Sequence, residues 1–262
     1  MLEVKDIYKT FNPGTVNEKH ALNGVSLSLK EGDFVTVIGS NGAGKSTLLN
    51  AIAGLWMVDS GSIKIAGDDI TKLPDYKRAK YIGRVFQDPM LGSAATMQIE
   101  ENMALAARRG KRRTLRKGIT QQEREKYREL LKELNLGLED RLTSKVGLLS
   151  GGQRQALTLL MSTMEKPKLL LLDEHTAALD PKTAAKVLDL TEKLVNENNL
   201  TTFMVTHNMR DALKYGNRLI MMCDGKIIFD VEGEQKKKLE VKDLLEKFNI
   251  AGGIVSDSMM LG

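Results

Sequence analysis

The stretch Gly39-Ser40-Asn41-Gly42-Ala43-Gly44-Lys45-Ser46-Thr47 decides the fold of this chain. It follows the β-rich run Phe34–Ile38, and residues 45–53 predict a helix that Gly54 ends. The glycines let backbone N–H groups point inward at phosphate oxygens, and the helix adds its positive end. Lys45 then reaches the β- and γ-phosphates, and the Ser46 hydroxyl is a ligand for Mg²⁺. This spacing makes a functionless glycine-rich turn a poor alternative.

Two further motifs follow this loop. The first is Leu149-Ser150-Gly151-Gly152-Gln153. The second is the apolar run Leu169–Leu172, which predicts a strand buried on both faces and leads into Asp173-Glu174. The carboxyl end of such a strand is where α/β sheets bind ligands. In this order, the three motifs resemble the nucleotide-binding subunit of an ABC (ATP-binding cassette) transporter. The resemblance covers about residues 1–245, and the LSGGQ element excludes P-loop kinases and GTPases.

The resemblance implies an α/β fold of the P-loop NTPase, ABC ATPase type. Its parts would be a mainly parallel core sheet with helices, an N-terminal antiparallel β subdomain and an inserted helical subdomain. Residues 1–262 would form one domain. The expected boundaries are 1–88 and 166–245 for the nucleotide-binding core with the β subdomain, 89–165 for the helical subdomain and 246–262 for a C-terminal tail.

The residue pattern supports this organisation. Strands that alternate with helices imply a parallel sheet. Asp180 caps a helix with Pro181 at its first position, the strand Thr201–Thr206 follows, and Asp224-Gly225 predicts a hairpin. The N-terminal thirty or so residues are strand-like and turn-rich, which predicts the antiparallel subdomain. Between about residues 90 and 165 the strand signals vanish, and three helices are predicted, at Gln98–Ala107, Gln121–Asn135 and Gln153–Glu165.

The composition is that of an ordinary globular protein, with 42% hydrophobic and 28% charged residues in 262. No apolar run approaches the ~18–20 residues that cross a bilayer. The N-terminal residues carry charges where a signal peptide has an apolar stretch. The single cysteine, Cys223, excludes an intramolecular disulfide and fits a reducing compartment. We expect it to pack as a small hydrophobic residue.

The net charge of +5 comes from one segment. Residues 108–117, RRGKRRTLRK, contain seven basic and no acidic residues, and acidic residues outnumber basic ones in the rest of the chain. Proteins that bind nucleic acid usually spread basic residues over a docking face and interleave aromatic ones, so no nucleic acid is expected as a partner. Two interpretations stay open: a solvated loop, or contact with anionic lipid or with an acidic loop of a membrane partner.

The resemblance assigns roles to four side chains outside the phosphate loop. Asp173 would hold Mg²⁺, and Glu174 would polarise the attacking water, a role that typically contributes about 10²–10⁴-fold. Gln87 would sense Mg²⁺ and the water, and His207 would contact the γ-phosphate and position Glu174. Without the resemblance, these residues could be a solvated pair at a strand end, a surface amide and a capping or core histidine.

Ser150, Gly151, Gly152 and Gln153 open a helix whose exposed N–H groups form an anion-binding end. In the family this end binds the γ-phosphate that the opposite subunit holds. The resemblance therefore implies a homodimer, arranged head to tail and assembled by ATP, with two MgATP sites. Asp180 would lie along its interface.

Two positions are less regular. An aromatic residue should stack on adenine, and Phe11 matches the family position, with Tyr8 as the alternative and core packing as a third reading for either. His175 stands where the family commonly has proline. It could approach the γ-phosphate or the dimer partner, or it could occupy the place of the proline and adjust the local backbone.

The resemblance implies an ATP-hydrolysing motor subunit, peripheral at the cytoplasmic face of the cell membrane. Separate transmembrane permease subunits would dock near Gln87–Ala95, together with a solute-binding protein. The separate-subunit arrangement resembles bacterial importers. The runs Gly83–Pro89 and Asp173–Asp180, together with the basic segment 108–117, resemble a bacterial group linked to uptake of amino acids such as tryptophan. The alternatives are the ATPase of an exporter, a soluble ABC ATPase that acts on DNA or ribosomes, and a non-catalytic binding module. The intact catalytic side chains disfavour the last.

Overall fold

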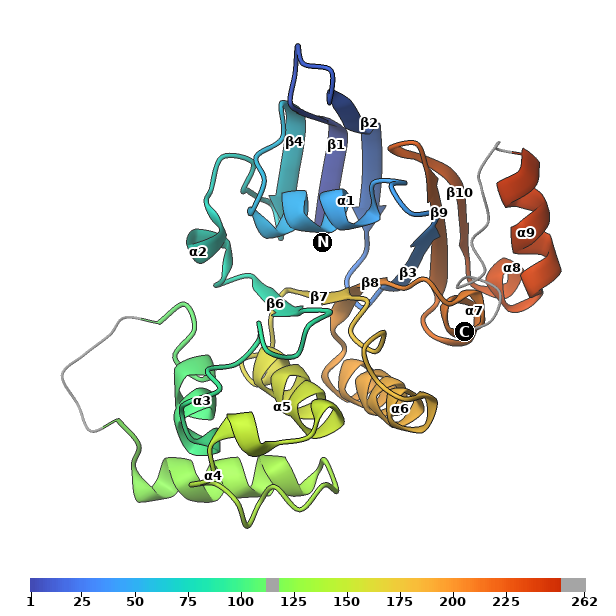
Figure 1. The fold of residues 1–262 in the computed structure, drawn as a ribbon. Helices are drawn as coiled ribbons and strands as arrows, with labels where there is room; N and C mark the ends of the chain where they lie inside the picture. Colours follow the sequence, from blue (N-terminus) through green and yellow to red (C-terminus); the bar gives the residue numbers. More distant parts are fainter. Residues whose placement is uncertain (112–117, 251–262) are drawn as a thin grey trace.

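A computed structural model describes residues 1–111 and 118–250 of the chain. Its core is a six-stranded sheet in the order β10-β9-β3-β8-β7-β6 (Figure 1). All neighbouring pairs from β9 to β6 are parallel, whereas β10 is antiparallel to β9. The predicted, mainly parallel core sheet is therefore confirmed. Its strands are β3 (Phe34–Gly39), β6 (Ile82–Val85), β7 (Leu169–Asp173), β8 (Thr201–Val205), β9 (Arg218–Cys223) and β10 (Lys226–Glu232).

A second sheet is antiparallel and has the order β2-β1-β4-β5. It contains β1 (Leu2–Phe11), β2 (Lys19–Leu29), β4 (Ser60–Ile65) and β5 (Asp68–Asp69). The sequence predicted this sheet from the N-terminal residues, but half of its strands come after the phosphate loop. The reason is that β4 pairs with β1, so a segment that follows the loop completes the sheet that precedes it.

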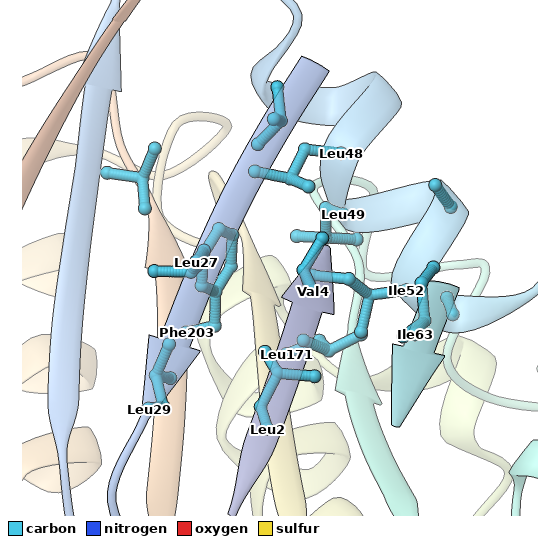
Figure 2. Packing of buried hydrophobic residues seen from close by; sticks show 14 of the residues in the cluster. Leu2, Val4, Leu27, Leu29, Leu48, Leu49, Ile52, Ile63, Leu171 and Phe203 are labelled. Carbon is cyan, nitrogen blue, oxygen red and sulfur yellow. The ribbon is translucent and has the colours of Figure 1, made fainter. Parts of the chain in front are cut away.

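Helix α1 (Lys45–Ala53) lies between the two sheets and is buried by both. It has the predicted bounds, and Gly54 ends it at φ 86° with its N–H donating to Asn50 O at 3.0 Å. Arg78, in α2 (Asp75–Arg78), caps the same end, because its NH1 donates to Ala51 O at 2.7 Å. Figure 2 shows the shared apolar cluster, with residues of the helix and both sheets: Leu2, Val4, Leu27, Leu29, Leu48, Leu49, Ile52, Ile63, Leu171 and Phe203.

The chain between β6 and β7 is helical in its described part, as predicted, and has an apolar cluster of its own. Helix α3 (Ile99–Ala106) agrees with prediction, whereas α4 (Gln121–Lys132) ends three residues early and α5 (Gly151–Thr163) begins two residues early. Ser150 is the N-cap of α5, which agrees with the prediction that Ser150–Gln153 open a helix, and α5 also ends two residues before the predicted Glu165. The 3-10 turn η1 (Val146–Leu148) precedes it.

Three C-terminal helices lie at the β9–β10 end of the core sheet: α7 (Met209–Lys214), α8 (Glu234–Lys237) and α9 (Val241–Ile250) (Figure 1). Helix α6 (Pro181–Asn198), capped by Asp180 as predicted, packs instead against β7 and β8, beside α5. The boundary expected at residue 245 falls inside α9. Phe248, beyond this boundary, is fully buried, so the helix packs on the core past residue 245. Cys223 is buried at the end of β9, as expected. Within the described ranges, no helix is both long enough and apolar enough to cross a membrane.

His175 points into the protein beneath α6. It is 2% exposed, and its Nε2 lies 3.0 Å from Thr191 Oγ1. The Thr191 hydroxyl already donates to Val187 O at 2.7 Å, so it accepts from a His175 Nε2–H. The ring is therefore a neutral core residue. Its direction excludes the reading in which it approaches the γ-phosphate.

We expect His175 to make the folded protein sensitive to acid. Burial lowers its pKa to about 4, below the value of about 6.5 in an unfolded chain. Between these values the unfolded chain takes up a proton that the folded chain does not, so the free energy of unfolding falls as the pH falls. The loss should be about 3 kcal/mol by pH 4.

Urea denaturation of the wild type and of His175→Met at several pH values from 7.5 to 4 measures this loss. The variant should lose less stability over that range, because Met does not titrate. His20→Gln, a change at an exposed histidine, is the matched control and should follow the wild type. Parallel curves for the wild type and His175→Met would contradict the assignment.

Candidate active site

The predicted phosphate loop is a tight turn between β3 and α1. Gly42 and Gly44 have φ values of 83° and 98°, in the left-handed region that favours glycine. A Cβ atom on Gly44 would lie 2.5 Å from the backbone oxygen of Ala21. The close approach of β2 and the positive φ together require glycine at position 44.

A cavity of about 250 Å³ opens over this loop. Lys45 is only 6% exposed, and its Nζ donates to Gly39 O at 2.7 Å and to Ser40 O at 3.1 Å. Burial lowers the pKa of Lys45, and the charges of Glu174 and Asp173 oppose this effect. The backbone N–H groups, the helix end and this cation form a hollow suited to phosphates. Its lining residues are Phe11, Lys19, Ala21, Asn41, Gly42, Ala43, Gly44, Lys45, Ser46, Thr47 and Glu174.

Glu174 and His207 lie beside each other, as the sequence predicted. Glu174 Oε2 is 3.7 Å from His207 Nδ1, which is an ion-pair distance and longer than a hydrogen bond. The histidine lowers the pKa of Glu174, and the carboxylate raises the pKa of His207. Glu174 has an uncommon φ of 43°, and its N–H donates to Val205 O at 3.0 Å. The carboxylate is thus ionised and fixed next to the loop, as a proton acceptor for water must be.

Asp173 is held by an arginine to which the sequence analysis gave no role. Arg84 NH2 donates to Asp173 Oδ2 at 3.1 Å and to Asn50 Oδ1 at 2.7 Å. Burial raises the pKa of Asp173, and Arg84 opposes the rise. A charge within the otherwise uncharged strand Ile82–Val85 was the signal in the sequence that could have pointed to Arg84.

The proposed donors for Mg²⁺ come from two neighbouring cavities. Gln87 and Asp173 line one of about 470 Å³, and Ser46 lines the loop cavity with Glu174. Hydroxyl, amide and carboxylate oxygens are the hard donors that Mg²⁺ takes, and this ion usually completes its shell with waters and substrate phosphates. No three His, Cys, Asp or Glu side chains of residues 1–111 and 118–250 gather as a metal-holding group. By their chemistry, the oxygens of Ser46, Gln87 and Asp173 are of the kind that would hold Mg²⁺ together with phosphates.

The residues of the LSGGQ motif form a capping box at the start of α5. Ser150 Oγ accepts from Gln153 N at 3.3 Å, and Gln153 Oε1 accepts from Ser150 N at 3.2 Å. A Cβ on Gly152 would lie 2.2 Å from Thr183 Cγ2, so glycine lets α5 approach α6 closely. Ser150 and Gly151 are exposed.

Asp180 caps the neighbouring helix α6 through a bond from Thr183 N to its Oδ1 at 3.1 Å. Neither Asp180 nor any residue of Ser150–Gln153 lines the cavity around Lys45. Within one chain, the phosphate loop with Glu174 is therefore separate from the exposed start of α5 and from Asp180.

Phe11 ends β1 and lines the loop cavity, whereas Tyr8 does not. The Phe11 ring meets Trp56 edge to face, with centroids 4.9 Å apart. Trp56 is a second residue that the sequence analysis missed, because nothing in its surroundings along the chain connects it to Phe11. Of the two candidates for stacking on adenine, the structure favours Phe11.

Comparison with known proteins agrees with this geometry. A sequence model of the ABC transporter family matches residues 22–177. The chain is 47% identical, over 96% of its length and 100% of the relative, to a tyrosine transport ATP-binding protein of Clostridioides difficile (strain R20291). It is 36% identical, over 94% of its length and 76% of the relative, to a methionine import ATP-binding protein MetN of Clostridium tetani (strain Massachusetts / E88).

Solved structures show the same fold. A dimeric post-hydrolysis state of the ATP-binding cassette MJ0796, bound to ADP and Pi, has a TM-score of 0.75 at 32% identity, over 88% of this chain and 98% of that one. The ADP conformation of the cassette MJ1267 has a TM-score of 0.77 at 28% identity, over 95% and 98% of the two chains. The predicted ABC ATPase fold is confirmed. The chain belongs to the ABC transporter family and is an ATP-binding, ATP-hydrolysing subunit of such a transporter.

Proposed function

We propose that this chain drives the uptake of an aromatic amino acid by a bacterial importer. The single observation that supports the substrate class is the 47% identity to a tyrosine transport protein over 96% of this chain and the full length of that relative. Motor subunits do not contact cargo, so no side chain of this chain argues for a substrate. The chain would lie at the cytoplasmic face of the cell membrane, with separate permease subunits and a solute-binding protein.

The proposed division of labour follows from the geometry. Lys45 and the loop N–H groups would hold the β- and γ-phosphates. Glu174 would take the proton of the attacking water, and His207, 3.7 Å away, would keep that carboxylate oriented. Mg²⁺, held by Ser46, Gln87 and Asp173, would neutralise phosphate charge.

A second part of each site would come from the other chain of a dimer. The exposed start of α5 and Asp180 lie outside the loop cavity of their own chain, so we propose that they face the ATP of the partner. Two such chains, head to tail, enclose two ATP molecules. The dimeric cassette structures of similar fold support this assembly.

The permease would dock in a groove at the junction of the core with the helical part. A cavity of about 340 Å³ lies there, lined by residues that include Leu91, Gly92, Leu105, Met161 and Arg109. It overlaps the predicted docking segment 87–95, and its mixed lining of apolar side chains and arginines suits an amphipathic helix that carries an acidic residue. Residues 108–117, proposed to contact anionic lipid, lie partly outside the described residues, at 112–117.

Glu174→Gln should abolish ATP turnover and yet preserve ATP binding, because the amide cannot accept the proton but retains the shape of the side chain. Light scattering with and without MgATP should show a monomer that becomes a dimer only with MgATP. Adding Lys45→Ala to this variant is the control and should prevent assembly. Retained turnover would show that Glu174 is not the base. A protein that stays monomeric at saturating MgATP would contradict the proposed head-to-tail dimer.

Lys45→Met should weaken ATP binding by about 1.5–3 kcal/mol, roughly 10- to 100-fold, the usual value of hydrogen bonds to charged groups. Equilibrium binding of a fluorescent ATP analogue measures the change. Lys77→Met, at an exposed lysine of α2, is the matched control and should bind as the wild type does. Equal affinities for both variants would remove the phosphate-loop assignment.

Deletion of the gene for this chain in its native cells should abolish uptake of labelled tyrosine or tryptophan. Expression of the wild-type chain should restore that uptake. Glu174→Gln should fail to restore uptake, because a chain that does not hydrolyse ATP cannot drive transport through the permease. Uptake of alanine is the control and should not change. Unchanged uptake of both aromatic amino acids would exclude the proposed substrate class and leave the ATPase assignment intact.

A further inference from the structure

Arg84 is a largely enclosed charge at the candidate metal site. It lies on β6, which pairs in parallel with β7, the strand that ends at Asp173. Its side chain is 12% exposed and that of Asp173 is 15% exposed, with NH2 and Oδ2 3.1 Å apart. Phe86 covers the guanidinium, with 4.4 Å between Cζ and the ring centroid. Two opposite charges are thus paired almost out of contact with water.

The same nitrogen of Arg84 ties Asp173 to the helix of the phosphate loop. NH2 also donates to Asn50 Oδ1 at 2.7 Å. Asn50 and Ser46 are four residues apart on α1, so they lie on one face of that helix. The guanidinium therefore sits where β7 and the Ser46 face of α1 meet. Its Nε and NH1 are buried without a hydrogen-bond partner among the described residues.

We propose that Arg84 is a positioning residue that acts as the exchangeable counterion of Asp173. In the nucleotide-free protein it holds the carboxylate in place and compensates its charge. When a dication approaches, the same positive charge repels it, so Arg84 weakens the Mg²⁺ affinity of the site. The inference rests on the proposed role of Asp173 as a metal ligand.

The two effects follow from the same burial. A carboxylate that has lost its counterion in a poorly solvated site destabilises the fold. A cation a few ångströms from a binding site for another cation lowers its affinity, because the interaction is weakly screened there. Removal of Arg84 should therefore harm the empty protein and favour the metal-bound one. Removal of a residue that serves packing alone would destabilise the empty protein but would not strengthen Mg²⁺ binding.

A double-mutant cycle in EDTA, without nucleotide, tests the first effect. Thermal unfolding is measured for the wild type, Arg84→Met, Asp173→Asn and the double variant. Arg84→Met should lower Tm in the wild-type background and lower it much less in the Asp173→Asn background, where no carboxylate is left unpaired. Equal losses in both backgrounds would overturn the pairing.

A Mg²⁺ titration tests the second effect in the Glu174→Gln background, where hydrolysis does not interfere. Magnesium chloride is added to EDTA-treated protein in the presence of a fluorescent ATP analogue. The Mg²⁺ concentration at which binding of the analogue is half-maximal gives the half-saturating value. Arg84→Met should lower it by about tenfold or more, the scale expected from the repulsion between close charges near a protein surface. Arg84→Gln, which keeps N–H donors but no charge, should do the same if the Met variant folds poorly.

Two controls separate charge from structure. Arg84→Lys keeps the positive charge, so its half-saturating Mg²⁺ concentration should stay near that of the Glu174→Gln protein. Arg109→Met removes a second half-buried arginine, which lines the 340 Å³ cavity together with Arg84 but donates to Ser162 O and not to Asp173. It should leave the half-saturating Mg²⁺ concentration unchanged.

The outcomes for this inference and for the proposed metal site are distinct. Asp173→Asn alone should raise the half-saturating Mg²⁺ concentration, and an unchanged value would remove Asp173 from the metal site. If Asp173→Asn raises it while both neutral variants of Arg84 leave it unchanged or raise it, the metal site stands and the counterion role of Arg84 is wrong.

Discussion

The burial of α1 between two sheets is the constraint on which the rest of the structure depends. Leu48, Leu49 and Ile52 are fully buried, so the helix can neither slide nor rotate without exposing apolar surface. Each of these side chains is worth about 1.5–3 kcal/mol when buried. Because the helix is fixed, its first turn is fixed, and with it the direction of the N–H groups that form the phosphate hollow.

The charged side chains of the site have partners within the protein itself. Lys45 donates to two carbonyls of its own loop, Asp173 is bound by Arg84, and Glu174 faces His207. Lys45, Asp173 and Glu174 thus each have a polar partner, and leaving one of them buried without a partner would cost several kcal/mol. Ligand binding at such a site is an exchange of partners. Its net free energy is therefore smaller than the new contacts alone would suggest, and release after turnover is correspondingly easier.

Local signals made much of the fold predictable. The bounds of α1 follow from the glycines on either side, α6 begins where Asp180 and Pro181 indicate, and Asp224-Gly225 forms the predicted hairpin turn. The candidate site was predictable to the same degree: Lys45, Glu174 and Phe11 do line one cavity, and His207 lies beside Glu174. The remaining features are contacts between distant segments. The pairing of β4 with β1, the bond from Arg84 to Asp173 and the inward turn of His175 depend on which strands and helices become neighbours, which no local pattern records.

The close contact of α5 with α6 has a consequence for communication between sites. Thr183 packs against Gly152, a Cβ on Gly151 would lie 3.4 Å from Leu179, and residues 176–179 form a hydrogen-bonded turn that leads back to Glu174. In the proposed head-to-tail dimer, the start of α5 that would face one nucleotide is therefore connected, within its own chain, to the carboxylate that would serve the other. A shift of the start of α5 at one nucleotide would then displace Glu174 at the other. Events at the two nucleotides of a head-to-tail dimer would therefore be coupled.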